Sequence, residues 1–376
     1  MKTEYRKLGE YIKLVDVRNT DLKVNRLLGL SIEKRFIESI ANTIGTDFRP
    51  YKIVKKRQFA YGPVTSRNGE KITIALLEEP ECIISSSYSV FEVIDTSKLL
   101  PEYLMLWFSR PEFDRYARYK SHGSVREIFD WDEMCRVELP IPAIEVQQKI
   151  VDAYNTITKR IQIKQKINEN LEKTAQCLFE ELNKDKSYFE NKTIQGISKN
   201  VICGKTPSTS EKLFWGDEIP FITIPDMHGN SFIHTTERYL SNKGKKSQNA
   251  QTLPAKAICV SCIATVGLVS MTTKTSQTNQ QINSIICDDG ISPYYIFLAL
   301  KNMKEDLKRL GAGGSTTLNV SKSLFSQIKI SIPSKNEMDN FEKKVYPLFE
   351  KIQNNEKEVE KLQKIKQLII SRISGM

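Results

Sequence analysis

The sequence lacks the patterns that membrane insertion and secretion require. No stretch approaches the roughly 18 uninterrupted apolar residues of a membrane helix, and the most apolar segment, LPEYLMLWF, is about half that length. The N-terminus, MKTEYRKLGEYIKL, has no continuous apolar core of the kind found in a signal peptide. The cysteines are scattered without the spacing of a disulfide framework. These absences predict a reduced, cytoplasmic protein.

Motifs that carry most enzymatic chemistry are also missing. There is no dinucleotide-type G-x-G-x-x-G after a predicted strand, no Walker A loop, no H-E-x-x-H and no Asn-Pro-Pro-aromatic tetrapeptide of adenine methyltransferases. The one C-x-x-C, Cys259 to Cys262, lies in a strand-like run that points its thiols to opposite faces, which disfavours zinc. The histidines His122, His228 and His234 form no nucleophile-base pair by spacing. We therefore predict a non-catalytic chain that binds no metal or cofactor.

The chain has, in contrast, an excess of positive charge. It carries 56 Lys and Arg residues against 45 Asp and Glu, a formal net charge of +11. Such an excess favours a polyanionic partner such as nucleic acid, although many soluble proteins are mildly basic. Charge alone leaves both interpretations open.

The most informative feature is an internal repeat at a separation of about 191 residues. Gly123-Ser124 and Gly314-Ser315 each precede a short alternating stretch that ends in proline, VELPIP in one copy and IKISIP in the other. Upstream, LLPEYLMLWF aligns with ISPYYIFLAL, so that Tyr103 corresponds to Tyr295. The repeat divides the chain into a first globular domain (1–142), a central helix (143–183), a second globular domain (184–333) and a distal helix (334–376).

Both helical segments show heptad spacing, which is typical of a coiled coil. The apolar seam positions are Ile150, Tyr154, Ile157, Ile161, Leu171, Ala175, Leu178 and Leu182 in the central segment and Phe341, Val345, Leu348, Ile352, Val359, Leu362, Ile369 and Ile373 in the distal one. One chain satisfies two such seams most simply by packing them together as an antiparallel pair.

Several residues interrupt the expected helix pair. Lys164 and Asn168 in the first helix, and Asn355 and Lys366 in the second, either fix the pairing register or face solvent where the helices splay. Pro347 should kink the second helix near its first turns or displace its start.

Each globular domain mixes strand-like runs with short helices, which predicts an α+β fold. The runs KITIAL, CIISSSYSVFEV, AICVSCIATVGLVSM and QINSIIC read as strands, and helices are expected around 103–119 and 294–309. The turn GAGGSTT (311–317) lacks the Lys-Ser or Lys-Thr of a P-loop. It is better interpreted as a donor-rich loop that can approach a DNA backbone.

Three segments carry a family resemblance that extends over essentially the whole chain. GKTPSTSEKLFWGDEIPFITIPDM (204–227), TNQQIN (278–283) and LPIPAIEVQQKIV (139–151) resemble motifs of the specificity subunit of type I restriction-modification systems. Members of that family have two target-recognition domains, each followed by a long helical spacer. The distal copy departs from the pattern, because SIPSKNEMDNF has Glu-Met-Asp where a Glu-Gln pair is usual.

The resemblance implies a function without catalysis. Each domain is expected to read one half of an asymmetric, bipartite double-stranded DNA target, and the helices to set the spacing between the halves. Two modification (methyltransferase) subunits would bring S-adenosylmethionine and flip the adenine, and restriction (translocase-nuclease) subunits would complete the complex. The off-seam apolar residues Ile144, Val146 and Ile163 are expected to form a docking face for partners. The alternatives are a coiled-coil scaffold with incidental basic loops and an independent nuclease or methyltransferase with a degenerate site.

Side-chain chemistry indicates which residues are candidates for DNA binding. Cations and donor-rich loops suit phosphate, whereas Arg, Lys, Asn, Gln and Ser present paired groups to base edges. For phosphate we predict Lys55, Lys56 and Arg57 in the first domain and Lys205, Ser208 and Lys274 in the second. For base readout we predict Arg67, Asn68, His122, Ser124 and Arg126 in the first and Asn279, Gln280, Ser315 and Thr316 in the second. The alternatives are that the basic run is a solvated face and that Asn279 and Gln280 cap or bridge strands inside the domain.

Overall fold

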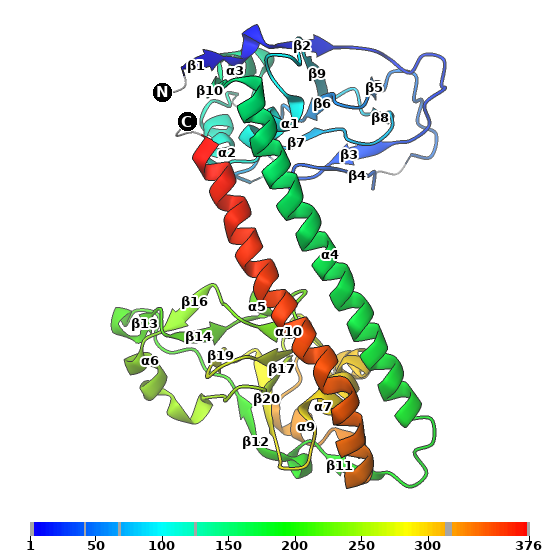
Figure 1. Cartoon of the computed structure of the whole chain (residues 1–376), viewed down its shortest axis with the longest axis vertical. Coiled ribbons are helices and arrows are strands. Elements are labelled where there is room, and N and C mark those ends of the chain that lie inside the picture. The colour runs from blue at the N-terminus through cyan, green and yellow to red at the C-terminus, as the bar shows by residue number, and fades with distance from the viewer. Residues whose placement is uncertain (1–3, 41–42, 67–68, 124–125, 313–317, 374–376) are drawn as a thin grey trace. The chain divides into compact units, whose positions relative to one another are not determined.

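The computed structural model describes residues 4–40, 43–66, 69–123, 126–312 and 318–373 (Figure 1). The chain forms two compact units, one made of residues 1–160 with 362–376 and the other of residues 161–361. Both units combine helices with mainly antiparallel sheets, so the α+β prediction is confirmed. No helix among the described residues is both long enough and apolar enough to cross a membrane.

The first unit is built on a four-stranded antiparallel sheet. Its strand order is β2 (Ile12–Val15), β9 (Ser89–Val93), β6 (Phe59–Tyr61) and β7 (Ile74–Leu76). Helices α1 (Pro101–Phe108) and α2 (Pro111–Tyr119) contribute to the same core, in which the rings of Phe59 and Phe91 stack at 4.8 Å. The smaller elements are β1 (Tyr5–Lys7), η1 (Leu8–Glu10), β3 (Leu28–Leu30), β4 (Phe36–Glu38), β5 (Lys52–Val54), β8 (Cys82–Ile84), α3 (Trp131–Arg136) and β10 (Glu138–Pro140).

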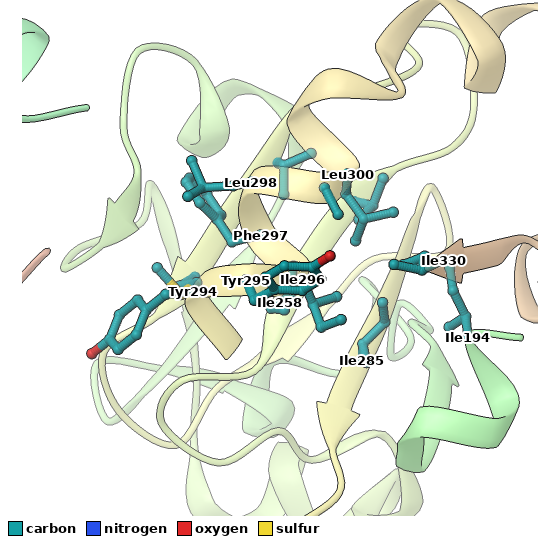
Figure 2. Packing of buried hydrophobic residues seen from close by; sticks show 14 of the residues in the cluster. Ile194, Ile258, Ile285, Tyr294, Tyr295, Ile296, Phe297, Leu298, Leu300 and Ile330 are labelled. Atoms are coloured by element: carbon teal, nitrogen blue, oxygen red, sulfur yellow. The ribbon is translucent and has the colours of Figure 1, made fainter. Parts of the chain in front are cut away.

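The second unit has a five-stranded sheet and a four-stranded sheet. The first has the order β12 (Ser198–Cys203), β20 (Ile282–Cys287), β17 (Ile258–Ser261), β18 (Val269–Thr272), β15 (Phe232–Ile233). The second has the order β13 (Trp215–Gly216), β16 (Arg238–Leu240), β14 (Ile219–Ile222), β19 (Gln277–Thr278). Helix α7 (Pro293–Asn302) packs its apolar side chains with Ile258 and Ile285 of the sheet (Figure 2). The remaining elements are β11 (Glu190–Thr193), η2 (Gln195–Ile197), η3 (Lys212–Phe214), α5 (Ile224–Met227), α6 (Asn242–Ser247), η4 (Asn249–Gln251), α8 (Lys304–Gly311), α9 (Lys322–Ser326) and β21 (Lys329–Ile332).

The sequence repeat is a structural repeat. The order β2-β9-β6-β7 in one domain matches β12-β20-β17-β18 in the other. The Tyr103 hydroxyl donates to the Pro140 carbonyl at 3.1 Å, and the Tyr295 hydroxyl donates to the Ser331 carbonyl at 2.8 Å. Helices α1 and α7 both begin at a proline, whose missing N–H costs nothing at that position. The predicted correspondence of Tyr103 with Tyr295 is therefore confirmed.

The two long helices are α4 (Ile144–Leu182) and α10 (Lys335–Arg372), as the heptad spacing predicted. They begin differently. In α4 the buried Gln147 amide accepts the Leu100 N–H and donates to the carbonyls of Lys98 and Pro142. At the equivalent position of α10 Met338 is buried in the apolar core instead. Ser334 and Glu337 form a capping box there.

Pro347 lies inside α10. The helix nevertheless begins at Lys335, so of the two expected effects of Pro347 a displaced start is contradicted, and a kink stays a prediction. The residues before Pro347 are held in the core by Phe341 and Val345, which are 4% and 0% exposed. That burial offsets the hydrogen bond that proline cannot donate.

The helices pack antiparallel, and each unit shows this separately. In the first unit Ile150 and Tyr154 of α4 share a core with Ile369 and Ile373, near the end of α10. In the second unit Phe179, near the end of α4, packs against Phe341 near the start of α10, with ring centroids 6.4 Å apart. Early residues of one helix therefore meet late residues of the other.

The polar seam residues contact one another. Lys164 Nζ donates to Asn355 Oδ1 at 3.1 Å and lies 2.6 Å from Glu358 Oε2. Asn355 Nδ2 donates to Asn168 Oδ1 at 2.8 Å, and Asn355 is only 1% exposed. In the other unit Lys366 Nζ lies 4.6 Å from the Tyr154 ring centroid. The helices do not splay at these residues, so the register-fixing interpretation is supported.

Candidate nucleic-acid interface

A rigid basic turn joins β5 to β6 in the first domain. Lys55 N–H donates to the Gln58 side-chain oxygen at 2.8 Å, and Gln58 N–H donates back to the Lys55 carbonyl at 3.0 Å. Arg57 has a positive φ of 67° and donates its N–H to Leu77. Lys55, Lys56 and Arg57 are exposed, but the Arg57 guanidinium pairs with Glu102 at 2.9 Å. Two of the three predicted cations thus project from a fixed turn, whereas Arg57 must leave a carboxylate to reach phosphate.

Two distant loops of the first domain lie together. Thr65 N–H donates to the Glu127 carbonyl at 2.9 Å, and Thr65 Oγ1 donates to Ser121 Oγ at 2.9 Å. His122 exchanges two backbone hydrogen bonds with Ile128, which hold these two residues side by side. His122 and Arg126 are exposed there. The fold therefore brings the segment before Arg67 beside the loop of His122. Arg67, Asn68 and Ser124 lie outside the described residues.

Gly123 explains how that loop closes. Its φ is +137°, a conformation that L side chains rarely adopt, and a Cβ there would lie 2.1 Å from the Arg126 carbonyl oxygen. The predicted reading loop of the first domain therefore depends on glycine at this position.

In the second domain the predicted residues separate into groups. Lys205 and Ser208 lie exposed on the loop after β12, and Gln280 is exposed beside that loop. Lys274 lies on another turn, with its Nζ 5.9 Å from the Tyr239 ring centroid. Ser315 and Thr316 lie outside the described residues.

Asn279 and its neighbour Gln280 have different environments. Asn279 is only 9% exposed, donates from Nδ2 to Gln281 Oε1 at 3.0 Å, and accepts the Gln281 N–H through Oδ1 at 3.1 Å. These bonds reach only the residue two positions further along the chain, so they support the capping alternative for Asn279 and not a bridge between strands. Gln280, in contrast, accepts a hydrogen bond from Thr206 Oγ1 at 2.6 Å while it stays exposed.

Two buried amides that sequence reasoning missed underlie this region. Gln277 is 0% exposed and donates from Nε2 to the carbonyls of Lys245 and Gln248 and to Thr252 Oγ1. Gln248 Nε2 donates to Gln277 Oε1 and to the Lys205 carbonyl, both at 2.8 Å. The available signal was the amide-rich run from Gln277 to Gln281, but the sequence does not show which amides are buried.

The C-x-x-C cysteines occupy different parts of the core, as the strand spacing predicted. Cys259 belongs to one apolar cluster and Cys262 to another. Burial raises the pKa of the Cys259 thiol to about 12 and that of Cys262 to about 11. Metal binding needs the thiolate, which such pKa values disfavour. Within the described ranges no group of three or more His, Cys, Asp and Glu side chains is arranged to hold a metal ion.

A group of contacts in the second unit, in which Glu356 and Glu172 bind Ser231 and Phe232, was not predicted; we call it the carboxylate joint. Glu356 of α10 accepts the backbone N–H groups of Ser231 and Phe232 at 2.8 and 3.0 Å, and Glu172 of α4 accepts the Ser231 hydroxyl. His234 Nε2 lies 4.0 Å from Glu356. Desolvation raises the pKa of Glu356 to about 8, and desolvation also lowers the pKa of His234. The joint ties both long helices to β15.

Known proteins share sequence with this chain. The family model described as the type I restriction modification DNA specificity domain matches twice, at residues 43–173 and 186–368. The type I restriction enzyme HindI specificity subunit of Haemophilus influenzae is 33% identical over an alignment that covers 86% of each chain. The MjaIX specificity subunit of Methanocaldococcus jannaschii is 30% identical over 47% of this chain and 41% of its own.

One solved structure resembles the whole fold. A type I restriction-modification S subunit from M. genitalium superposes with a TM-score of 0.62 at 14% identity, and the match covers 99% of this chain and 96% of that one. At this identity the likeness concerns the fold alone. The two family matches fall one on each copy of the repeat.

Proposed function

We propose a mechanism of DNA reading for this chain, which belongs to the family of type I restriction-modification DNA specificity subunits. Each globular domain reads one half of a bipartite double-stranded target. The target is asymmetric, because the reading surfaces of the two domains carry different side chains. The chain supplies recognition and is not an enzyme; methylation and cleavage belong to partner subunits.

The observation that carries this proposal is that the two globular domains share one fold but present different side chains on their surfaces. The sheets share their strand order. The first domain presents His122 and Arg126 beside the loop of Thr65, whereas the second presents Lys205 and Gln280 around Thr206. A conserved scaffold with changed loops is suited to hold two different base sequences.

The long helices act as a spacer in this proposal. At 1.5 Å per residue, a helix the length of α4 spans about 60 Å. The polar layer of Lys164, Asn168 and Asn355 fixes the register of the pair. The length of the paired helices then sets the gap between the two halves of the target.

Partner subunits dock on apolar residues outside the seam. Val146 and Ile163 of α4 are 38% and 60% exposed, and Ile365 and Leu368 of α10 are 45% and 53% exposed. Ile144, also predicted for this face, is half-buried. Such side chains on long helices suit contacts with the modification subunits, which would bring S-adenosylmethionine, and with restriction subunits.

Expression of the chain with and without its neighbouring genes, followed by sequencing of methylated DNA, tests the proposal. We expect methylation only with partners, at one motif made of two unlike parts around a fixed gap. Methylation by the chain alone would favour an independent enzyme. The absence of sequence-selective DNA binding in the complex would favour a scaffold.

A further inference from the structure

One surface hydrogen bond of the second domain holds a side chain that would otherwise be free to rotate. Thr206 Oγ1 donates to Gln280 Oε1 at 2.6 Å. Thr206 is half-buried and Gln280 is exposed, so the bond lies at the edge of the domain. An exposed glutamine gains little stability from one such bond, because it loses rotamer freedom in making it. The bond is better explained by what it does to the orientation of the amide.

The backbone beneath this bond is fixed on both sides. Lys205 N–H donates to the Thr278 carbonyl at 3.0 Å, and the Lys205 carbonyl accepts from Gln248. A Cβ at Gly204 would lie 2.1 Å from the Asn279 carbonyl oxygen, so the two segments approach as closely as glycine allows. The residues that carry Thr206 and Gln280 therefore keep one separation.

The buried side chains that support Thr206 and Gln280 are polar, and their burial lowers the stability of the domain. Among the described residues, Gln248 Oε1 and Thr278 Oγ1 are buried without a hydrogen-bond partner. Each such group carries a desolvation penalty of about 1 to 3 kcal/mol. Apolar side chains at these positions would avoid that penalty. Buried polar groups without a hydrogen-bond partner concentrate at functional sites.

We propose that Thr206 is a positioning residue that orients Gln280 to recognise an adenine edge in the major groove of the half-site read by the second domain. This inference rests on the proposed function. A carbonyl oxygen has two lone pairs, so Gln280 Oε1 can accept from Thr206 and also from adenine N6–H. Gln280 Nε2 then donates to adenine N7, which completes the bidentate pairing that glutamine makes with adenine. With the oxygen held by Thr206, the flipped amide is disfavoured.

The test uses the complex of this chain with its co-expressed modification subunits. The wild-type target is first read from methylated DNA, and binding is then measured to the matched duplex and to duplexes substituted at each base pair of the half-site. Thr206→Val removes the hydroxyl with little change in shape, and Thr206→Ser keeps it. Thr209→Val in the same loop is the matched control, and Gln280→Ala with the double variant Thr206→Val/Gln280→Ala measures coupling.

We expect Thr206→Val to lose about tenfold in discrimination at one adenine position of one half-site, with the other half-site unchanged. Thr206→Ser and Thr209→Val should discriminate as the wild type does, and the double variant should be no worse than Gln280→Ala. The inference is overturned if Thr206→Val keeps full discrimination, if it weakens all duplexes equally, or if its effect adds to that of Gln280→Ala. A wild-type complex that shows no sequence selectivity would instead refute the proposed function itself.

Discussion

Lys164 and Asn355 occupy equivalent positions in the two copies of the repeat, and they are hydrogen-bonded to each other at 3.1 Å. The two long helices are therefore in contact at equivalent positions of the repeat. Because the two equivalents differ, lysine on one helix and asparagine on the other, the pair can form a donor-to-acceptor bond at its centre.

The first prediction concerns that central contact. Asn355→Ala should lower the free energy of unfolding by about 1 to 3 kcal/mol, because Asn168 and Lys164 would both lose a partner in a buried seam. Urea unfolding measures the change. Asn354→Ala, one residue away and exposed, is the control and should change stability by less than about 0.5 kcal/mol. Equal stability of the two variants would contradict a register-fixing role.

Helix length provides the second prediction. Deleting residues 164–170 from α4 alone should mismatch the seam, whereas deleting residues 355–361 from α10 as well removes one heptad from both helices together with the polar layer. The double deletion should shorten the target gap by about 10 Å, or roughly three base pairs. The gap is measured from methylated motifs. A folded, active double deletion with an unchanged gap would rule out the spacer role.

The third prediction is a pH dependence of stability. The pKa of Glu356 is about 8 in the folded chain against an ordinary 4.5, so the folded state holds a proton that the unfolded state has released between these values. Stability should fall as pH rises through this window, by at most about 1.4 kcal/mol per pH unit. Glu356→Gln, which stays neutral, should remove that slope.

His234 acts in the opposite direction and must be separated from Glu356. Its lowered pKa means that stability is lost as pH falls below the ordinary value of 6.5. The charged neighbours Glu172, Lys274, Lys301, Lys357 and Glu360 also face the joint. Thermal unfolding between pH 6.5 and 8 isolates the contribution of Glu356. Glu350→Gln, exposed on the same helix, should keep the wild-type slope, and loss of the slope in both variants would be evidence against the joint.

Basic residues of the first domain give the fourth prediction. Lys56→Ala should weaken binding to matched and mismatched duplexes alike and reduce the salt dependence by about one ion. Arg57→Ala should have a smaller effect, because Arg57 already pairs with Glu102. Arg67→Ala should cost about 1 to 3 kcal/mol at one half-site only. A salt series with both duplexes measures all three, and unchanged discrimination in Arg67→Ala would place the reading surface elsewhere.

Features set by local periodicity could be predicted from the sequence. Heptad spacing located both long helices, and the repeat identified corresponding residues such as Tyr103 and Tyr295 without knowledge of the strand order. The seam prediction was less exact at Phe179, which is 6% exposed although the heptad register places Leu178 in the seam. Packing against Tyr295, with ring centroids 4.9 Å apart, accounts for this burial.

Features that depend on tertiary contacts could not be predicted. Asn279 and Gln280 are adjacent amides, and only the contacts with Gln281 and Thr206 distinguish a buried side chain that caps its own turn from an exposed side chain. Glu356 lies beside the seam residue Asn355 in a polar stretch, and its burial comes from the backbone of Ser231 and Phe232, more than 120 residues away. No periodic pattern encodes such a pairing.

The different starts of α4 and α10 limit how freely the two copies of the repeat can be exchanged. If the first domain were joined to α10, Met338 would replace Gln147, whose amide is hydrogen-bonded to Leu100 and Lys98. The Leu100 N–H and the Lys98 carbonyl would then lose their partner at the point where domain and helix join. A modular exchange of recognition domains in this chain must therefore carry the first turn of the helix along with the domain that it serves.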